Sequence, residues 1–142
     1  MNQETIFLPM LALAALTFFV LLFIPLRRFR AAFAGQVTPA DFALGESANV
    51  PAQVSLPNRN YMNLLELPVL FYAVCVAAYV THTVDGLLVN LAWGYVALRA
   101  LHSAVHISVN HVVTRLSFFA ISNFVLMAMW ILFGMRIWGQ AA

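Results

Sequence analysis

The fold is decided by the stretch Asn58-Arg59-Asn60-Tyr61-Met62-Asn63-Leu64-Leu65-Glu66-Leu67-Pro68. Its polar residues precede the hydrophobic run 67–80 directly, and no break is predicted between them. Arg59, Asn63 and Glu66 are spaced i, i+4 and i+7, so they lie on one face of a helix. A charged side chain inside a membrane segment costs roughly 2.5–3.5 kcal/mol on insertion scales and is therefore usually paired or functional. Three such groups on one face predict a binding site.

The remainder of the 142-residue chain is strongly apolar, with 63% hydrophobic and 8% charged residues. Soluble domains carry about 25% charged residues, so this composition predicts an integral membrane protein. The net charge of +2 comes from seven basic residues, all of them arginine. Such a balance argues against a nucleic-acid partner, which needs basic residues concentrated on a soluble surface. The single cysteine, Cys75, lies in an apolar run and excludes a disulfide framework.

Four segments are long enough for a helix to cross a bilayer, which needs about 20 residues, namely 6–26, 58–80, 87–107 and 113–137. We therefore expect an all-α integral membrane protein, a four-transmembrane-helix up-down bundle forming a single domain over residues 1–142. Pro68 predicts a bend in the second span, because it removes one backbone hydrogen bond. Within the long connection 27–57, residues 39–42 can start a short interfacial helix.

Basic residues gather on one side of this topology. They follow the first span, open the second and open the fourth, at Arg27, Arg28, Arg30, Arg59 and Arg115. The opposite side has only Arg136. The positive-inside rule therefore predicts that both termini lie outside and that the loop 27–57 is cytoplasmic. The expected location is a bacterial inner (cell) membrane.

The span 87–107 and the turn after it carry a second polar stripe, Arg99, His102, His106 and Asn110, spaced i, i+3, i+7 and i+11. This stripe approaches the same side of the membrane as the first. Together the two stripes set several arginines against one carboxylate, Glu66. The excess positive charge predicts an anionic or zwitterionic ligand with more than one carboxylate.

Simpler explanations exist for each group taken singly. Arg59 and Glu66 could form only an interhelical salt bridge, and arginines at helix ends commonly snorkel to the interface. His102 and His106 could ligate a metal or haem, but the only further histidine nearby is His111, and no carboxylate on that helix orients the imidazoles. We therefore expect hydrogen-bonding histidines and no metal, and we favour a site because intramembrane ionisable residues are functional by default.

The stretch 58–68 resembles the signature of the MAPEG family, the membrane-associated proteins in eicosanoid and glutathione metabolism. Its core is Arg-x-x-x-Asn-x-x-Glu on the second of four helices. The segment from Arg99 to Asn110, followed by Arg115, resembles the third helix and following turn of the bacterial branch. Chain length, four spans and a long first loop agree as well, so the resemblance covers essentially the whole chain. Within the family, the chain resembles the microsomal glutathione transferase-like members.

This resemblance implies a homotrimer of four-helix bundles in membrane lipid, with glutathione bound as co-substrate between adjacent subunits on the cytoplasmic side. By position, it implies glutathione-binding roles for Arg59, Asn63, Glu66, Arg99, His102 and His106, with Arg27 or Arg28 reaching the site from a neighbour. It also implies that Arg115 is catalytic. A thiol has a pKa near 8.5, and a nearby arginine lowers it by favouring the thiolate. The implied activity is a glutathione transferase or peroxidase acting on lipophilic electrophiles.

The chain departs from the eicosanoid-synthesising members. Those members have tyrosines near the places of His102 and His106, and an aromatic residue where this chain has Leu67, which disfavours a leukotriene or prostaglandin synthase. Two other functions stay open. One is a non-catalytic membrane scaffold or accessory subunit that binds anionic lipid in the same pocket. The other is a small transporter or channel, which the apolar outer half of the bundle disfavours because it offers no polar path across.

Overall fold

The computed structural model describes residues 2–141, and within that range it contains helices and no strand. A short 3-10 helix precedes the first α-helix, and a second one interrupts the long loop. In chain order the elements are η1 Gln3–Ile6, α1 Phe7–Phe33, η2 Pro39–Phe42, α2 Ala52–Leu65, α3 Pro68–Val80, α4 Gly86–Ile107 and α5 Val112–Ala141. The predicted all-α class is confirmed.

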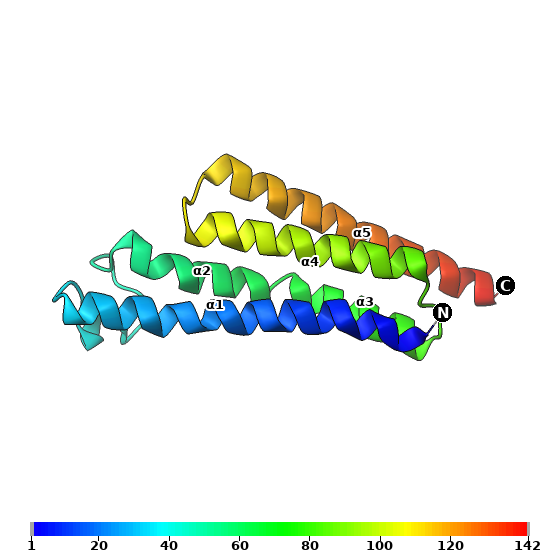
Figure 1. Cartoon of the computed structure of the whole chain (residues 1–142), viewed down its shortest axis with the longest axis horizontal. Coiled ribbons are helices and arrows are strands. Elements are labelled where there is room, and N and C mark those ends of the chain that lie inside the picture. The colour runs from blue at the N-terminus through cyan, green and yellow to red at the C-terminus, as the bar shows by residue number, and fades with distance from the viewer. Residues whose placement is uncertain (1, 142) are drawn as a thin grey trace.

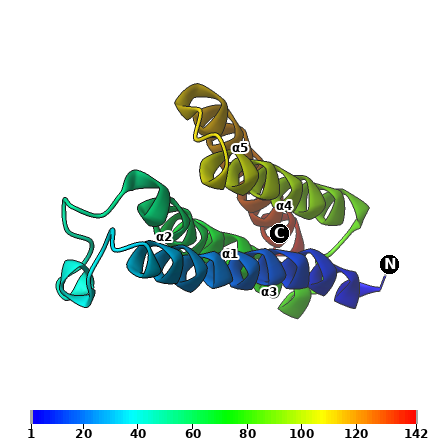
Figure 2. The same cartoon turned by 60° about the vertical axis from the view of Figure 1, so that its left-hand side comes forward.

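The helices form two antiparallel pairs that run along one long axis (Figure 1). α1 is paired with the α2–α3 segment, and α4 is paired with α5. The loop 34–51 and the turn 108–111 lie at one end of the bundle, called here the loop end. Both chain ends and the turn 81–85 lie at the other, called here the terminus end. Figures 1 and 2 both show the α4–α5 pair diverging from the α1–α2 pair towards the loop end.

The second long segment is broken at Glu66, whose φ of −77° and ψ of −92° are not helical. Pro68 starts α3 and has no N–H to donate to the carbonyl of Leu64, so the backbone ladder stops there. The bend predicted at Pro68 is confirmed. The expectation that the polar stripe enters the hydrophobic run without a break is wrong. Glu66 still donates its backbone N–H to Met62 O at 3.1 Å, so it completes the last turn of α2.

The helical segments extend beyond the predicted spans. α1 continues to Phe33, so the three arginines after the first span lie on a helix rather than in a loop. α2 begins at Ala52, and Arg59 therefore lies in its middle rather than at its start. The short helix expected at residues 39–42 is present as η2, and a capping box between Thr38 and Asp41 starts it.

Three segments are long and apolar enough to cross a membrane by themselves: Gln3–Phe33, Ala52–Val80 and Val112–Gln140. The remaining helix, α4, has 22 residues, but its polar stripe lowers its hydropathy. It runs beside the other helices over most of their length (Figure 1). α4 thus lies alongside the three span-capable segments but is not itself apolar enough to count among them.

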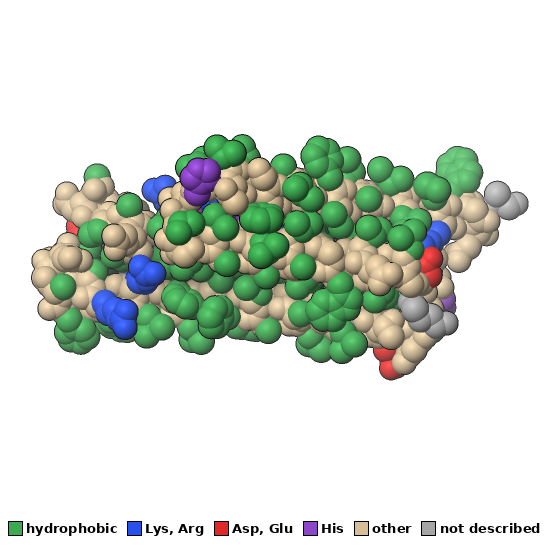
Figure 3. Space-filling view, turned by 45° about the horizontal axis from the view of Figure 1, so that its top comes forward, with side chains coloured by type: hydrophobic (Ala, Val, Ile, Leu, Met, Phe, Trp, Pro, Cys, Tyr) green, Lys and Arg blue, Asp and Glu red, His purple; other side chains and the backbone are tan. Residues whose placement is uncertain are grey.

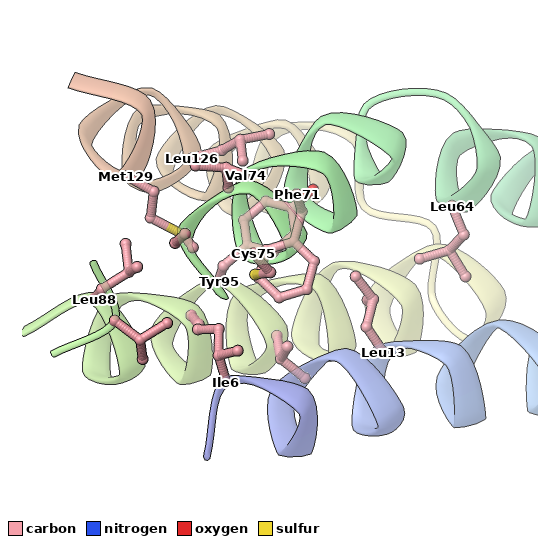
Figure 4. Close-up of a cluster of buried hydrophobic side chains, with 14 of the residues drawn as sticks. Ile6, Leu13, Leu64, Phe71, Val74, Cys75, Leu88, Tyr95, Leu126 and Met129 are labelled. Atoms are coloured by element: carbon pink, nitrogen blue, oxygen red, sulfur yellow. The ribbon is translucent and has the colours of Figure 1, made fainter. Parts of the chain in front are cut away.

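The hydrophobic core fills the half of the bundle near the terminus end. Figure 4 shows side chains from all four segments meeting there, including Ile6, Phe71, Tyr95 and Met129. The rings of Phe71 and Tyr95 stack with centroids 4.8 Å apart. Cys75 is fully buried in this core, as expected of a small hydrophobe. A second, smaller cluster holds the long loop against α1 and α2; it comprises Ala31, Val37, Val50 and Val54, with Phe42 packed on it.

Candidate functional site

Arg99 is the centre of the candidate site. It lies on α4, is 0% exposed, and donates one hydrogen bond from its Nη2 to the backbone carbonyl of Asn63 on α2. Its Nε and Nη1 have no partner among residues 2–141. The guanidinium carbon lies 5.5 Å from the ring centroid of Phe119 and 5.9 Å from that of Tyr95. A buried charge with unmet donors is costly, so this guanidinium is suited to an acceptor brought by a ligand.

His102 and His106 lie one turn apart on α4 and are 3% and 2% exposed. His102 Nδ1 is 3.0 Å from the carbonyl oxygen of Arg115. A carbonyl only accepts, so Nδ1 carries the proton and donates. His102 Nε2 and both ring nitrogens of His106 have no partner in the described part of the chain. The two rings stand 5.5 Å apart, edge to face.

Asn60 and Ser103 also belong to this cluster, although neither is among the site residues predicted from the sequence. Asn60 on α2 is 0% exposed, and its Oδ1 accepts a hydrogen bond of 3.3 Å from Ser103 Oγ on α4. The Asn60 Nδ2 donor is buried without a partner among the residues described. Ser103 is spaced i+4 from Arg99, which could have revealed it. Neutral polar residues are commonly interhelical contacts, so spacing alone carried little signal.

The α2 stripe lies nearer the surface than the α4 stripe. Arg59 and Glu66 are exposed, and Asn63 is half-buried with its Nδ2 donating to the carbonyl of Arg59 at 3.1 Å. Within residues 2–141, Arg59 and Glu66 form no ion pair with each other. Arg59 instead lines a cavity of about 490 Å³ at the loop end, together with Glu46, Ser47, Ala48, Val50, Ala52, Ser55, Leu56 and Asn110.

Arg115 lies in the first turn of α5. Its Nη1 donates to Asn110 Oδ1 at 2.6 Å. Asn110 has a φ of +47°, a left-handed conformation that Asn tolerates and that turns the chain from α4 into α5. A second cavity, of about 200 Å³, is lined by Asn63, His102 and Arg115 with Val112, Leu116 and Phe119. The fold therefore brings one predicted site residue from each of α2, α4 and α5, namely Asn63, His102 and Arg115, to the same cavity.

Arg28 is engaged by the long loop. Its Nη2 lies 3.1 Å from Glu46 Oε1, and its guanidinium carbon lies 4.4 Å above the ring centroid of Phe42. Glu46 in turn lines the cavity of Arg59. Arg28 is thus linked to the candidate site through a carboxylate.

No group of three His, Cys, Asp or Glu side chains within residues 2–141 is close enough to hold a metal ion. His111, the remaining histidine near the stripe, is 2.8 Å from Thr114 Oγ1 through its Nδ1. The polar groups at the loop end are mostly donors, which suits an organic anion better than a cation.

Comparison with known proteins gives a match to one family model and to no individual protein. No significant match was found among curated proteins or among solved structures. The sequence model of the MAPEG family matches residues 6–135, which include every candidate site residue described above. The chain therefore belongs to the MAPEG family.

Proposed function

We propose that this MAPEG member binds glutathione at the loop end of the bundle and uses it as a co-substrate against lipophilic electrophiles, as a homotrimer in a bacterial inner membrane. Members of the family generally use glutathione, which fits a glutathione-related membrane function. The observation that carries the proposal is the buried Arg99, whose Nε and Nη1 have no acceptor in the described chain. Further arginines at the same end, Arg59 and Arg115, add to the positive charge.

The charges of glutathione complement those of the site. Glutathione offers two carboxylates, one ammonium and one thiol. Arg59 and Arg99 are suited to the carboxylates, since guanidinium–carboxylate hydrogen bonds are short and often bidentate. Glu66, exposed at the end of α2, is suited to the ammonium. His102, His106 and Asn63 add polar contacts, and Arg28 could contribute from a neighbouring subunit in the trimer.

Arg115 is the proposed catalytic residue. The thiol loses its proton to solvent, and the guanidinium stabilises the thiolate that remains. The thiolate then forms a C–S bond with an electrophilic carbon, and the leaving group departs with its bonding electrons. Arg115 shares its cavity with Asn63 and His102, so a thiolate there would lie beside proposed glutathione-binding residues.

The test is a glutathione titration of the purified protein in detergent, followed by isothermal calorimetry and by thiolate absorbance at about 240 nm. Arg59→Ala should weaken binding. Arg115→Ala should keep binding but lose the thiolate signal. His111→Ala is the control, because His111 is exposed near the site and bonds locally to Thr114.

Absence of glutathione binding at millimolar concentration would overturn the proposal. Phospholipid that co-purifies at Arg59 and is not displaced by glutathione would decide for a scaffold or accessory subunit instead. Retention of the thiolate signal in Arg115→Ala would move the catalytic role to another arginine.

A further inference from the structure

Asn110 connects the two cavities of the proposed glutathione site. It lines the cavity of about 490 Å³ that contains Arg59. Its Oδ1 accepts the hydrogen bond of 2.6 Å from Nη1 of Arg115, and Arg115 lines the cavity of about 200 Å³ with Asn63 and His102. The two cavities share no lining residue, so this hydrogen bond joins a residue of one cavity to a residue of the other.

The turn from α4 into α5 does not need the side chain of Asn110. The backbone N–H of Asn110 donates to the carbonyl of Val105 at 2.8 Å, and that of Ser108 donates to the carbonyl of Ala104 at 3.1 Å. The φ of +47° at Asn110 is one that glycine adopts more easily than asparagine. Glycine would therefore serve the backbone at least as well, and the amide side chain is left for another role.

That side chain fixes the direction of the Arg115 guanidinium. Within residues 2–141, Arg115 forms no ion pair, and the bond to Asn110 is the one hydrogen bond that its side chain makes. The backbone of Arg115 is held separately, because His102 Nδ1 donates to its carbonyl oxygen at 3.0 Å. An arginine side chain has several rotatable bonds, so without an acceptor it would sample many orientations. Held by Nη1, the guanidinium keeps its Nε and Nη2 donors for a ligand.

The acceptor that holds Arg115 carries no charge. An amide oxygen accepts a hydrogen bond and leaves the guanidinium with its full positive charge, whereas a carboxylate in the same place would form an ion pair and offset that charge. Positive charge is concentrated at the loop end, where Figure 3 shows most of the visible basic side chains. A neutral acceptor therefore directs Arg115 without weakening its attraction for an anion.

We propose that Asn110 is a positioning residue that directs the Arg115 guanidinium towards the sulfur of bound glutathione. The inference rests on the proposed function, because it requires glutathione in the site and Arg115 as the cation that stabilises the thiolate. Asn110 acts through Arg115, so it increases the thiolate population and is not needed to hold the rest of the tripeptide.

Two measurements on the detergent-purified protein separate positioning from ligand binding. The first is the pKa of the bound glutathione thiol, followed by thiolate absorbance at about 240 nm across a pH series. The second is the affinity for S-methylglutathione by calorimetry, which is independent of thiolate formation because the methylated sulfur cannot ionise. Asn110→Gly keeps the left-handed backbone and removes only the acceptor.

In Asn110→Gly the pKa of the bound thiol should rise by about one unit, which is roughly a tenfold lower ratio of thiolate to thiol. Its affinity for S-methylglutathione should equal that of the wild type. A side chain that served only the stability of the turn would leave the thiol pKa unchanged, so thermal unfolding of each variant is measured alongside.

His82→Gly is the matched control. His82 is exposed in the turn at the terminus end and has a φ of +55°, so this variant makes the same kind of replacement far from the site. Both the thiol pKa and the S-methylglutathione affinity should stay at the wild-type values.

Asn110→Asp provides a second test if Asn110→Gly folds poorly. Aspartate tolerates the same φ and keeps an acceptor for Arg115, but its negative charge disfavours a thiolate nearby. The thiol pKa should therefore rise at least as far as in Asn110→Gly.

An unchanged thiol pKa in Asn110→Gly or in Asn110→Asp would overturn the inference and leave the proposed function standing. Loss of S-methylglutathione affinity in Asn110→Gly would also overturn it, because Asn110 would then hold the ligand rather than position Arg115. Failure of the wild type to bind both glutathione and S-methylglutathione would overturn the proposed function, and the inference with it.

Discussion

The two ends of the bundle differ in whether their polar side chains have hydrogen-bond or ion-pair partners within the chain. At the terminus end, Arg136 forms an ion pair with Asp85 and donates to the carbonyl of Thr83 at 2.8 Å. Gln3 and Val84 exchange two hydrogen bonds, of 3.1 and 3.0 Å. These contacts tie η1, the turn 81–85 and α5 together.

At the loop end, by contrast, buried donors and acceptors of Asn60, Arg99, His102 and His106 have no partner among residues 2–141. Both ends contain arginine, so residue type alone does not separate them. The difference is whether the chain itself supplies the acceptor. We therefore expect substitutions at the terminus end to alter the free energy of unfolding, and substitutions at the loop end to alter ligand binding. Functional sites commonly retain polar groups that do not contribute to stability.

Arg99→Met should produce the largest effect and tests the loop end directly. Glutathione affinity should fall about 10- to 100-fold, since hydrogen bonds to charged groups contribute about 1.5–3 kcal/mol. The free energy of unfolding should stay the same or rise, because a buried charge with few partners gains little from folding. Calorimetry and thermal unfolding in the same detergent measure the two quantities.

Arg99→Lys is the control for charge, and it should restore affinity only in part because lysine lacks the planar fork of donors. A large loss of stability in Arg99→Met with unchanged glutathione affinity would reverse the assignment of the loop end.

Asp85→Ala tests the terminus end. It removes the ion pair with Arg136 and the N-cap acceptor that Leu88 N reaches at 2.9 Å. The free energy of unfolding should fall by about 1–2 kcal/mol, since a cap contributes about 1 kcal/mol and a partly exposed ion pair less. Glutathione affinity should not change.

Asp85→Asn keeps the capping acceptor and should therefore cost less than Asp85→Ala in the same unfolding assay. Weaker glutathione binding in either variant would mean that the two ends are coupled, contrary to the comparison.

The smallest effect concerns Asp41 in the loop. The backbone N–H of Thr38, at 2.8 Å, and the hydroxyls of Ser47 and Thr38 hold the pKa of Asp41 below its ordinary value. A lowered folded pKa stabilises the loop above the unfolded pKa of about 3.9, and this contribution is lost as the pH falls through the folded pKa.

Amide exchange at Thr38, corrected for its intrinsic rate, should therefore stay slow at neutral pH and speed up in acid below about pH 4. Asp41→Asn should show fast exchange at every pH. Slow exchange in that variant would show that the carboxylate does not hold the loop.

Much of the site could be predicted from helical spacing. Arg99, His102 and His106 lie on one buried face as their i, i+3, i+7 pattern indicates, and Pro68 bends its segment as its missing N–H requires. Asn60 could not be found in this way, because a neutral polar side chain on a helix is as often a packing contact as a ligand. The ion pair between Arg28 and Glu46 could not be predicted either. It joins a helix to a long loop, and the sequence does not indicate the conformation of that loop.

The sequence by itself determined that the chain is helical, enters a membrane and carries two polar stripes, because composition and periodicity act through local backbone geometry and transfer free energy. Only the tertiary structure decided which polar groups are satisfied. Arg136 meets Asp85 and Thr83 across the bundle, whereas Arg99 meets a single backbone carbonyl and keeps two donor nitrogens without a partner in the described chain. Pairing depends on how helices distant in sequence are set against each other, and spacing along one helix does not contain that information.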